Sequence, residues 1–123
     1  MIESPYKGET GVRRVISATR NSAAGFAEAL RCEDAFRQEV LIAALMVPLA
    51  IVLGHNGVER ALLAASVLLV LVVELLNSAV EATVDRISFE NHRLAKRAKD
   101  IGSAAVMLSL LLAALTWVLI LLT

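Results

Sequence analysis

The chain ends with the stretch IGSAAVMLSLLLAALTWVLILLT, residues 101–123, which contains no charged side chain. At about 1.5 Å per residue, a helix of this length reaches roughly 34 Å, enough to cross a hydrocarbon core of roughly 30 Å. The composition agrees with a membrane setting, because 58% of the residues are hydrophobic and the mean hydropathy is +0.71. We therefore expect an integral membrane protein in which this stretch is one spanning helix.

Two further apolar stretches lie at 40–53 and 61–73, and the second continues with polar interruptions to residue 84. Both are short for a bilayer and can span it only by drawing in neighbouring residues. Between them, His55, Asn56 and Gly57 predict a tight polar turn. The expected architecture is all-α, a single membrane domain over residues 1–123. Its expected elements are an amphipathic surface helix at about 12–31 and transmembrane helices at about 34–53, 60–86 and 99–122.

The basic residues predict the orientation of these helices, because cytoplasmic loops are enriched in Lys and Arg. The first connection holds only Arg60, whereas the second connection and the N-terminal region are basic. We therefore expect the N-terminus and the second connection in the cytoplasm, and the C-terminus outside. The cytoplasmic basic residues would be Arg13, Arg14, Arg20, Arg31, Arg86, Arg93, Lys96, Arg97 and Lys99.

The segment at about 12–31 has helical periodicity but a weak apolar face. Val12, Val15, Phe26 and Leu30 share one side, while arginines flank it. This pattern is typical of a helix that lies on the anionic inner leaflet, although a helix that caps the bundle would show it too. In the last span, Ala105, Ser109 and Ala113 form a row of small residues that favours close helix contact and an oligomer.

A stripe of polar side chains interrupts the second span. At about 100° per residue, its members fall on one narrow face of a helix. A charged side chain at the bilayer centre costs roughly 3 kcal/mol even on lenient insertion scales, so this face must meet protein, water or a ligand. The members of the stripe are Glu74, Asn77, Ser78, Glu81 and Asp85.

Counting along the helices predicts partners for this stripe at equal depth. From Arg60 at the outer edge, Glu74 lies about 21 Å and Glu81 about 31 Å across the membrane. Counting back from Gly54 in the first span puts Glu39 at the depth of Glu74, and Glu33 near the level of Glu81. The third span adds charge at the same inner boundary, with Lys99 and Asp100, and Ser103 just inside it.

Carboxylates from separate helices and a lysine at the cytosolic interface suit phosphoryl transfer to a lipid headgroup. Carboxylates hold Mg²⁺ that bridges the phosphates of ATP, and a lysine pairs with phosphate oxygens. Glu74 lies on the bilayer side of this cluster, where it could take a proton from a lipid hydroxyl. We found neither a Walker P-loop nor a GxGxxG motif, so a nucleotide would be bound in another way.

Other interpretations of the same residues stay open at this point. The stripe could be interhelical hydrogen-bonding glue, and Asp85 could simply pair with Arg86 or Lys99. A small proton-coupled transporter subunit would also carry intramembrane glutamates, although its acidic path should continue to the outer surface. Cys32 is expected to be a buried, inert thiol. His55 and His92 fall in opposite connections and cannot share a zinc ion, and the balanced charge of the chain gives no sign of a nucleic-acid partner.

Three blocks of this sequence resemble the prokaryotic integral-membrane diacylglycerol kinases. They are EDAFRQE at 33–39, ELLNSAVEATVDR at 74–86 and AKDIGSAA at 98–105, in the order that the family has them. The resemblance implies a homotrimer in the bacterial inner membrane that transfers the γ-phosphoryl group of MgATP to 1,2-diacylglycerol and forms phosphatidic acid. A related branch with a similar stripe phosphorylates undecaprenol instead, which leaves the acceptor lipid open.

The resemblance also implies roles for individual residues. Glu74 would be the general base, and Glu33 and Glu81 would hold the metal. The nucleotide site would comprise Glu33, Asn77, Glu81, Asp85, Lys99 and Asp100. The lipid site would comprise Arg14, Ser22, Glu39, Glu74 and Ser103. Some relatives differ where this chain has Asn21, Ala23, Ala24 and Lys96, so lipid entry and the inner loop are less firmly implied.

Overall fold

The computed structural model describes residues 10–87 and 92–123, and the side chain of His92 lies outside that description. The described residues form four helices and no strand. Three of the helices are long and apolar enough to cross a membrane. The predicted all-α class is therefore confirmed. The helices are α1 (Gly11–Cys32), α2 (Asp34–Leu53), α3 (Gly57–Ile87) and α4 (His92–Leu122).

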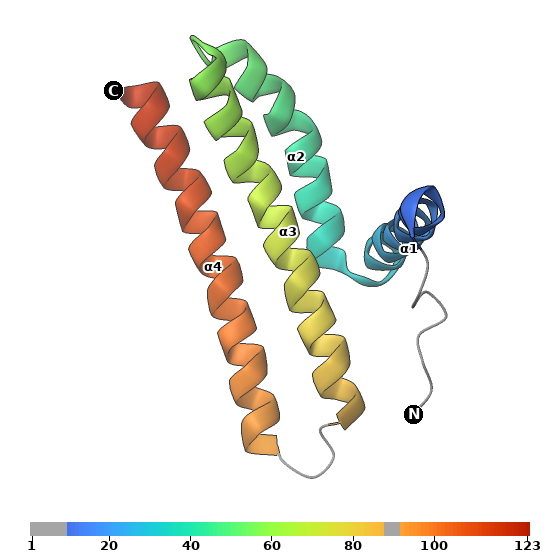
Figure 1. Ribbon diagram of the computed structural model, residues 1–123. Helices are drawn as coiled ribbons and strands as arrows, with labels where there is room; N and C mark the ends of the chain where they lie inside the picture. The colour runs from blue at the N-terminus through green and yellow to red at the C-terminus, as the bar shows by residue number, and fades with distance from the viewer. Residues whose placement is uncertain (1–9, 88–91) are drawn as a thin grey trace.

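The three long helices run side by side with α3 in the middle, packed against both α2 and α4 (Figure 1). The far end of α4 lies at the same end of the bundle as the turn between α2 and α3. Half of the buried side chains among the described residues belong to α3, including Leu63, Val67, Val70 and Glu74. The polar stripe that the sequence predicts thus sits on the most enclosed helix of the chain.

Helix α1 lies to one side of the bundle and points across it, next to the inner end of α2 (Figure 1). Only Ala29 of α1 is buried, while Val12, Val15 and Phe26 remain exposed in the single chain. The apolar face of α1 is therefore not used to cap the bundle. This arrangement favours the first of the two sequence interpretations, a helix whose apolar face is free to enter a leaflet.

A tight elbow joins α1 to α2 at Glu33, whose backbone is extended with φ −116° and ψ 107°. Its N–H donates to the Ala29 carbonyl at 3.0 Å and its carbonyl accepts from the Arg37 N–H at 3.1 Å. The Arg37 guanidinium donates to the carbonyls of Leu30 at 2.9 Å and Arg31 at 2.8 Å, and it also pairs with Asp34. Arg37 therefore satisfies carbonyls that the end of α1 would otherwise leave without partners.

The turn between α2 and α3 is closed by a glycine and an asparagine. A Cβ on buried Gly54 would lie 2.6 Å from Arg60 Cγ and 2.9 Å from Arg60 N, so only glycine fits. The Asn56 side chain accepts the Glu59 N–H at 2.9 Å and caps the start of α3. His55 contacts the Glu59 carboxylate with both its backbone N–H and its ring, each at 3.0 Å.

Helices α3 and α4 are joined by a side-chain hydrogen bond toward the outer end. Trp117 Nε1 of α4 donates to the Leu63 carbonyl and to Ser66 Oγ of α3, each at 3.2 Å. Ser109, in the middle of the predicted row of small residues, is buried and donates to the Val106 carbonyl at 2.7 Å. Hydroxyl groups in this part of the bundle are thus satisfied within the protein, as lipid surroundings require.

Candidate functional site

The polar stripe of α3 runs from a buried end to an exposed end. Glu74 is only 8% exposed, Asn77 and Glu81 are half-buried, and Asp85 is exposed. This gradient follows α3 toward the end of the bundle where α3 connects to α4. A ligand that reaches Glu74 from that end would pass the other members of the stripe.

Glu39 of α2 faces Glu74, as the depth count predicts. The two carboxyl groups lie close enough to interact directly, and Glu39 is half-buried. Glu39 Oε2 is buried and finds no hydrogen-bond partner among the described residues. The bundle thus holds two facing carboxyl groups, one of which has an unsatisfied oxygen. Hydrogen bonding between helices does not explain this arrangement.

Asn77 lies about one turn further along α3, at a point where α3 and α4 approach each other closely. Its Nδ2 donates to Glu81 Oε1 at 3.1 Å, while its Oδ1 is buried without a partner among the described residues. A Cβ added to Gly102 of α4 would overlap with Asn77 Oδ1. Glycine at 102 is therefore what lets α4 approach the stripe closely at this level.

Lys99 of α4 brings a positive charge to the same part of α3. Its ammonium group pairs with Asp85 at 2.6 Å and also feels the charge of Glu81. Of the two partners considered for Asp85, the structure therefore selects Lys99. Asp100 pairs with Lys96 at 2.6 Å, and both side chains are exposed. Carboxylates, an amide and a lysine from two helices thus meet near the inner end of α3.

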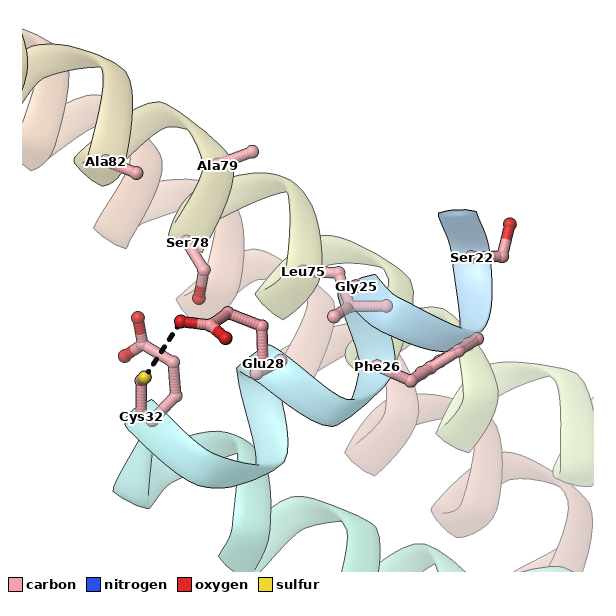
Figure 2. A pocket seen from close by; sticks show the side chains of 11 residues that line it. Ser22, Gly25, Phe26, Glu28, Cys32, Leu75, Ser78, Ala79 and Ala82 are labelled. Atoms are coloured by element: carbon pink, nitrogen blue, oxygen red, sulfur yellow. Dashed lines mark hydrogen bonds between the residues drawn. The ribbon is translucent and has the colours of Figure 1, made fainter. Parts of the chain in front are cut away.

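Glu33 lines a separate groove of about 610 Å³ between α1 and α3. Figure 2 shows Ser78 of α3 pointing toward Glu28 and Cys32 of α1 across this groove. Ser22 also lines the groove, together with Ala79 and Ala82. These α3 residues lie on a side of the helix rotated from the side that carries Glu81. The sequence predicts similar depths for Glu33 and Glu81. In the single chain, however, Glu33 does not lie against the face of α3 that carries Glu81.

Cys32 corrects one expectation, because the thiol is exposed and not buried. It donates to Glu28 Oε1 at 3.3 Å, and Arg31 pairs with the same carboxylate. This thiol and the Arg31 charge hold the pKa of the Glu28 carboxyl below its usual range. The burial prediction failed because α1 stands away from the bundle, so the last turn of α1 faces the groove.

The described residues contain no group of three or more His, Cys, Asp or Glu side chains arranged to hold a metal ion. The donors present still fit Mg²⁺, which commonly takes one or two protein carboxylates and completes its shell with phosphate oxygens and water. Glu33 and Glu81 are the carboxylates that the resemblance implies for this role; Glu81 lies on the stripe and Glu33 on the neighbouring groove, so each could supply a ligand from its own side. His55, exposed in the turn between α2 and α3, is engaged with Glu59.

The remaining predicted lipid-site residues lie at the edges of the site. Arg14 is exposed on the first turn of α1, and Ser103 is exposed on α4 directly after Gly102. Sequence reasoning assigned no role to Arg37 or Gly102, although both fall inside the diagnostic blocks. A glycine in the middle of an apolar helix and an arginine at a predicted helix start are signals that could have identified them.

These features define a small helical membrane protein with a polar site enclosed by its own spanning helices. A sequence model of the family described as prokaryotic diacylglycerol kinase matches residues 20–121. The chain belongs to this family.

Curated relatives match over nearly their whole length. The diacylglycerol kinase of Pseudomonas aeruginosa is 53% identical over 122 residues, which are 99% of each chain. That of Escherichia coli K12 is 47% identical over 112 residues, 91% of this chain and 92% of the relative. That of Helicobacter pylori is 40% identical over 115 residues, 94% of this chain and 89% of the relative.

Proposed function

We propose that this protein is an ATP-dependent lipid kinase that transfers the γ-phosphoryl group of ATP to 1,2-diacylglycerol and releases phosphatidic acid and ADP. Membership of the family and the names of the relatives support the reaction. The observation that carries the assignment to this site is the buried Glu74 carboxylate facing Glu39. A base at this depth meets a lipid hydroxyl and is shielded from bulk water.

In the proposed reaction, Glu74 accepts the proton of the diacylglycerol hydroxyl as its oxygen attacks the γ-phosphorus. The bond from the γ-phosphorus to the bridging oxygen breaks, and ADP leaves with that oxygen. Glu39 faces the base and helps to orient the hydroxyl. Arg14, Ser22 and Ser103 complete the lipid site at the headgroup level.

The nucleotide would occupy the exposed end of the stripe. Asn77, Asp85, Lys99 and Asp100 bind the nucleotide, and Lys99 supplies the positive charge for phosphate oxygens. Glu33 and Glu81 would hold Mg²⁺, which when bound neutralises phosphate charge and orients the γ-phosphoryl group. The Asp85–Lys99 ion pair keeps the lysine extended along the site before the nucleotide arrives.

Purified protein in mixed micelles tests this reaction directly. We expect radiolabelled phosphate to move from MgATP to 1,2-diacylglycerol, with far less transfer to undecaprenol. Predominant transfer to undecaprenol would assign the chain to the polyprenol branch. Absence of transfer to both lipids would overturn the proposal.

We further propose that the protein works as a homotrimer in the bacterial inner membrane, with its N-terminus and the α3–α4 connection in the cytoplasm and its C-terminus outside. Membership of the family, whose resemblance implies a trimer, supports this assembly. Chemical cross-linking in native membranes should give a ladder that ends at three chains. A ladder that ends at one chain would contradict the trimer.

A further inference from the structure

A narrow apolar groove of about 210 Å³ runs lengthwise between α2, α3 and α4. Glu39 lies at its inner end and Trp117 at its outer end, while residues such as Met46, Val67 and Ala113 line its walls. The inner end is continuous with the proposed site of transfer, because Glu39 faces Glu74. A ligand in this groove would therefore extend from the proposed base toward Trp117.

The length of the groove matches one lipid chain. Trp117 donates to Leu63 and Ser66, which lie eleven and eight residues from Glu74 along α3. At about 1.5 Å per residue, the indole therefore sits about 12–16 Å outward from the Glu74 carboxylate. This distance is about half of a roughly 30 Å hydrocarbon core, which is the reach of a single acyl chain.

The volume of the groove also fits one chain and not two. About 210 Å³ spread over this length leaves room for one acyl chain and not for a second chain beside it. Its walls are aliphatic and offer an acyl chain dispersion contacts without polar competition. The second chain of a diacylglycerol would stay in the surrounding lipid.

Trp117 closes the outer end of the groove. Its two hydrogen bonds to α3 hold the indole across the gap between α4 and α3, so the ring cannot swing aside without leaving a buried N–H unsatisfied. An acyl chain ends where the ring begins. A polyprenyl chain, which is several times longer, would have to pass it.

We propose that one acyl chain of the acceptor lipid lies in the α2–α3–α4 groove and that Trp117, by closing this groove, makes the enzyme select diacylglycerol over polyprenols. This inference rests on the proposed lipid kinase function and adds a specificity-determining residue to it. The Trp117 indole limits the length of the lipid chain that the groove accepts and takes no part in phosphoryl transfer.

Trp117 is the only tryptophan of the chain, so its fluorescence reports the contents of the groove in the unaltered protein. We expect a diacylglycerol brominated near the end of one acyl chain to quench this fluorescence at least threefold more than one brominated near the glycerol. Phosphatidylcholine brominated at the same positions serves as the bulk-lipid control. Equal quenching by diacylglycerol and phosphatidylcholine at every position, or no quenching because a second copy of the chain fills the groove, would overturn the inference.

Substitution provides the second test. Trp117→Ala should raise the ratio of kcat/KM for undecaprenol to kcat/KM for diacylglycerol about tenfold, whereas Trp117→Phe, which keeps an aromatic ring but loses both hydrogen bonds to α3, should give a smaller rise. Leu119→Ala, on the exposed side of α4, is the matched control. An unchanged ratio in an active Trp117→Ala protein would overturn the inference and leave the kinase function standing. If the alanine variant does not fold, the quenching experiment decides.

Discussion

Glu74 combines a carboxylate with almost complete burial in a membrane helix. Burial on this scale is costly for an ion, and the facing Glu39 carboxyl adds repulsion when both groups are charged. Within residues 10–87 and 92–123, neither group pairs with a lysine or arginine, and the charge of Lys99 is directed to Asp85 and Glu81. A buried carboxyl pair in such surroundings is explained by the proposed reaction and not by the stability of the fold.

Glu74→Gln should therefore lower kcat at least a hundredfold, in line with the roughly 10²–10⁴-fold that a general base contributes. The amide keeps the shape of the side chain, so nucleotide binding should stay within about twofold of the unaltered protein. Phosphate transfer and equilibrium nucleotide binding, measured on the same preparation, check this. Glu59→Gln at the outer turn is the matched control, and near-normal turnover of the Glu74 variant would remove Glu74 from the role of base.

The proposed metal ligands predict a different kinetic signature. Glu33→Gln and Glu81→Gln should each raise the Mg²⁺ concentration needed for half-maximal activity about tenfold or more, because each removes one negative ligand. Titration of activity with Mg²⁺ at fixed ATP measures this. Glu28→Gln, a carboxylate on the same groove as Glu33, is the control. An unchanged Mg²⁺ requirement in both variants would show that these carboxylates do not hold the metal.

Gly102→Ala tests the close approach between α3 and α4. The added Cβ would overlap with Asn77 Oδ1, and overpacking of this kind typically costs about 1–3 kcal/mol. We expect a lower thermal unfolding temperature in detergent and a loss of activity of about tenfold, because Asn77 must move away from Glu81. Gly57→Ala is the control, since a Cβ there meets nothing within 4 Å. Equal effects of the two substitutions would mean that the contact is unimportant.

At the scale of elements, the elbow between α1 and α2 is the joint that positions Glu33. Arg37 reaches back over it to two carbonyls of α1 and to Asp34, so one side chain fixes the direction in which α1 leaves the bundle. The planar guanidinium suits this task, because it donates to several acceptors at once. Lysine carries the same charge but lacks the planar arrangement of several N–H donors.

Arg37→Ala should release α1 and raise KM for MgATP about tenfold through the displaced Glu33, with a smaller effect on kcat. Arg37→Lys should recover only part of this loss. A merely structural role would instead lower the amount of folded protein and leave KM unchanged in the folded fraction. Steady-state kinetics after size-exclusion chromatography distinguish the two results, and Arg20→Ala on the exposed face of α1 is the control.

At the scale of the whole molecule, helix periodicity and the constant rise per residue carry most of the sequence prediction. The turn at residues 54–57 provides a common origin for counting, so Glu39 is predicted opposite Glu74, and the structure brings the two together. The sequence offers Arg86 and Lys99 as partners for Asp85, and the structure pairs Asp85 with Lys99.

The position of a residue along a helix axis does not predict the direction in which its side chain points around that axis. Glu33 therefore lines the α1–α3 groove, away from the face of α3 that carries Glu81. The exposure of Cys32 depends on how far α1 stands from the bundle, which no local pattern encodes. The fit of Gly102 against Asn77 depends on the distance between two helices, and a single sequence does not contain that distance.

The elbow at Glu33 ties α1 to only one end of the bundle, while the opposite end holds only the short turn at Gly54 and the end of α4. In the proposed orientation, the apolar face of α1 would enter the inner leaflet and would keep the polar stripe at a constant height relative to the cytosolic headgroups. A change in bilayer thickness is then absorbed at the outer end, far from the chemistry. Attachment of α1 to one end of the bundle would let the enzyme keep working when a bacterium alters its fatty acids with growth temperature.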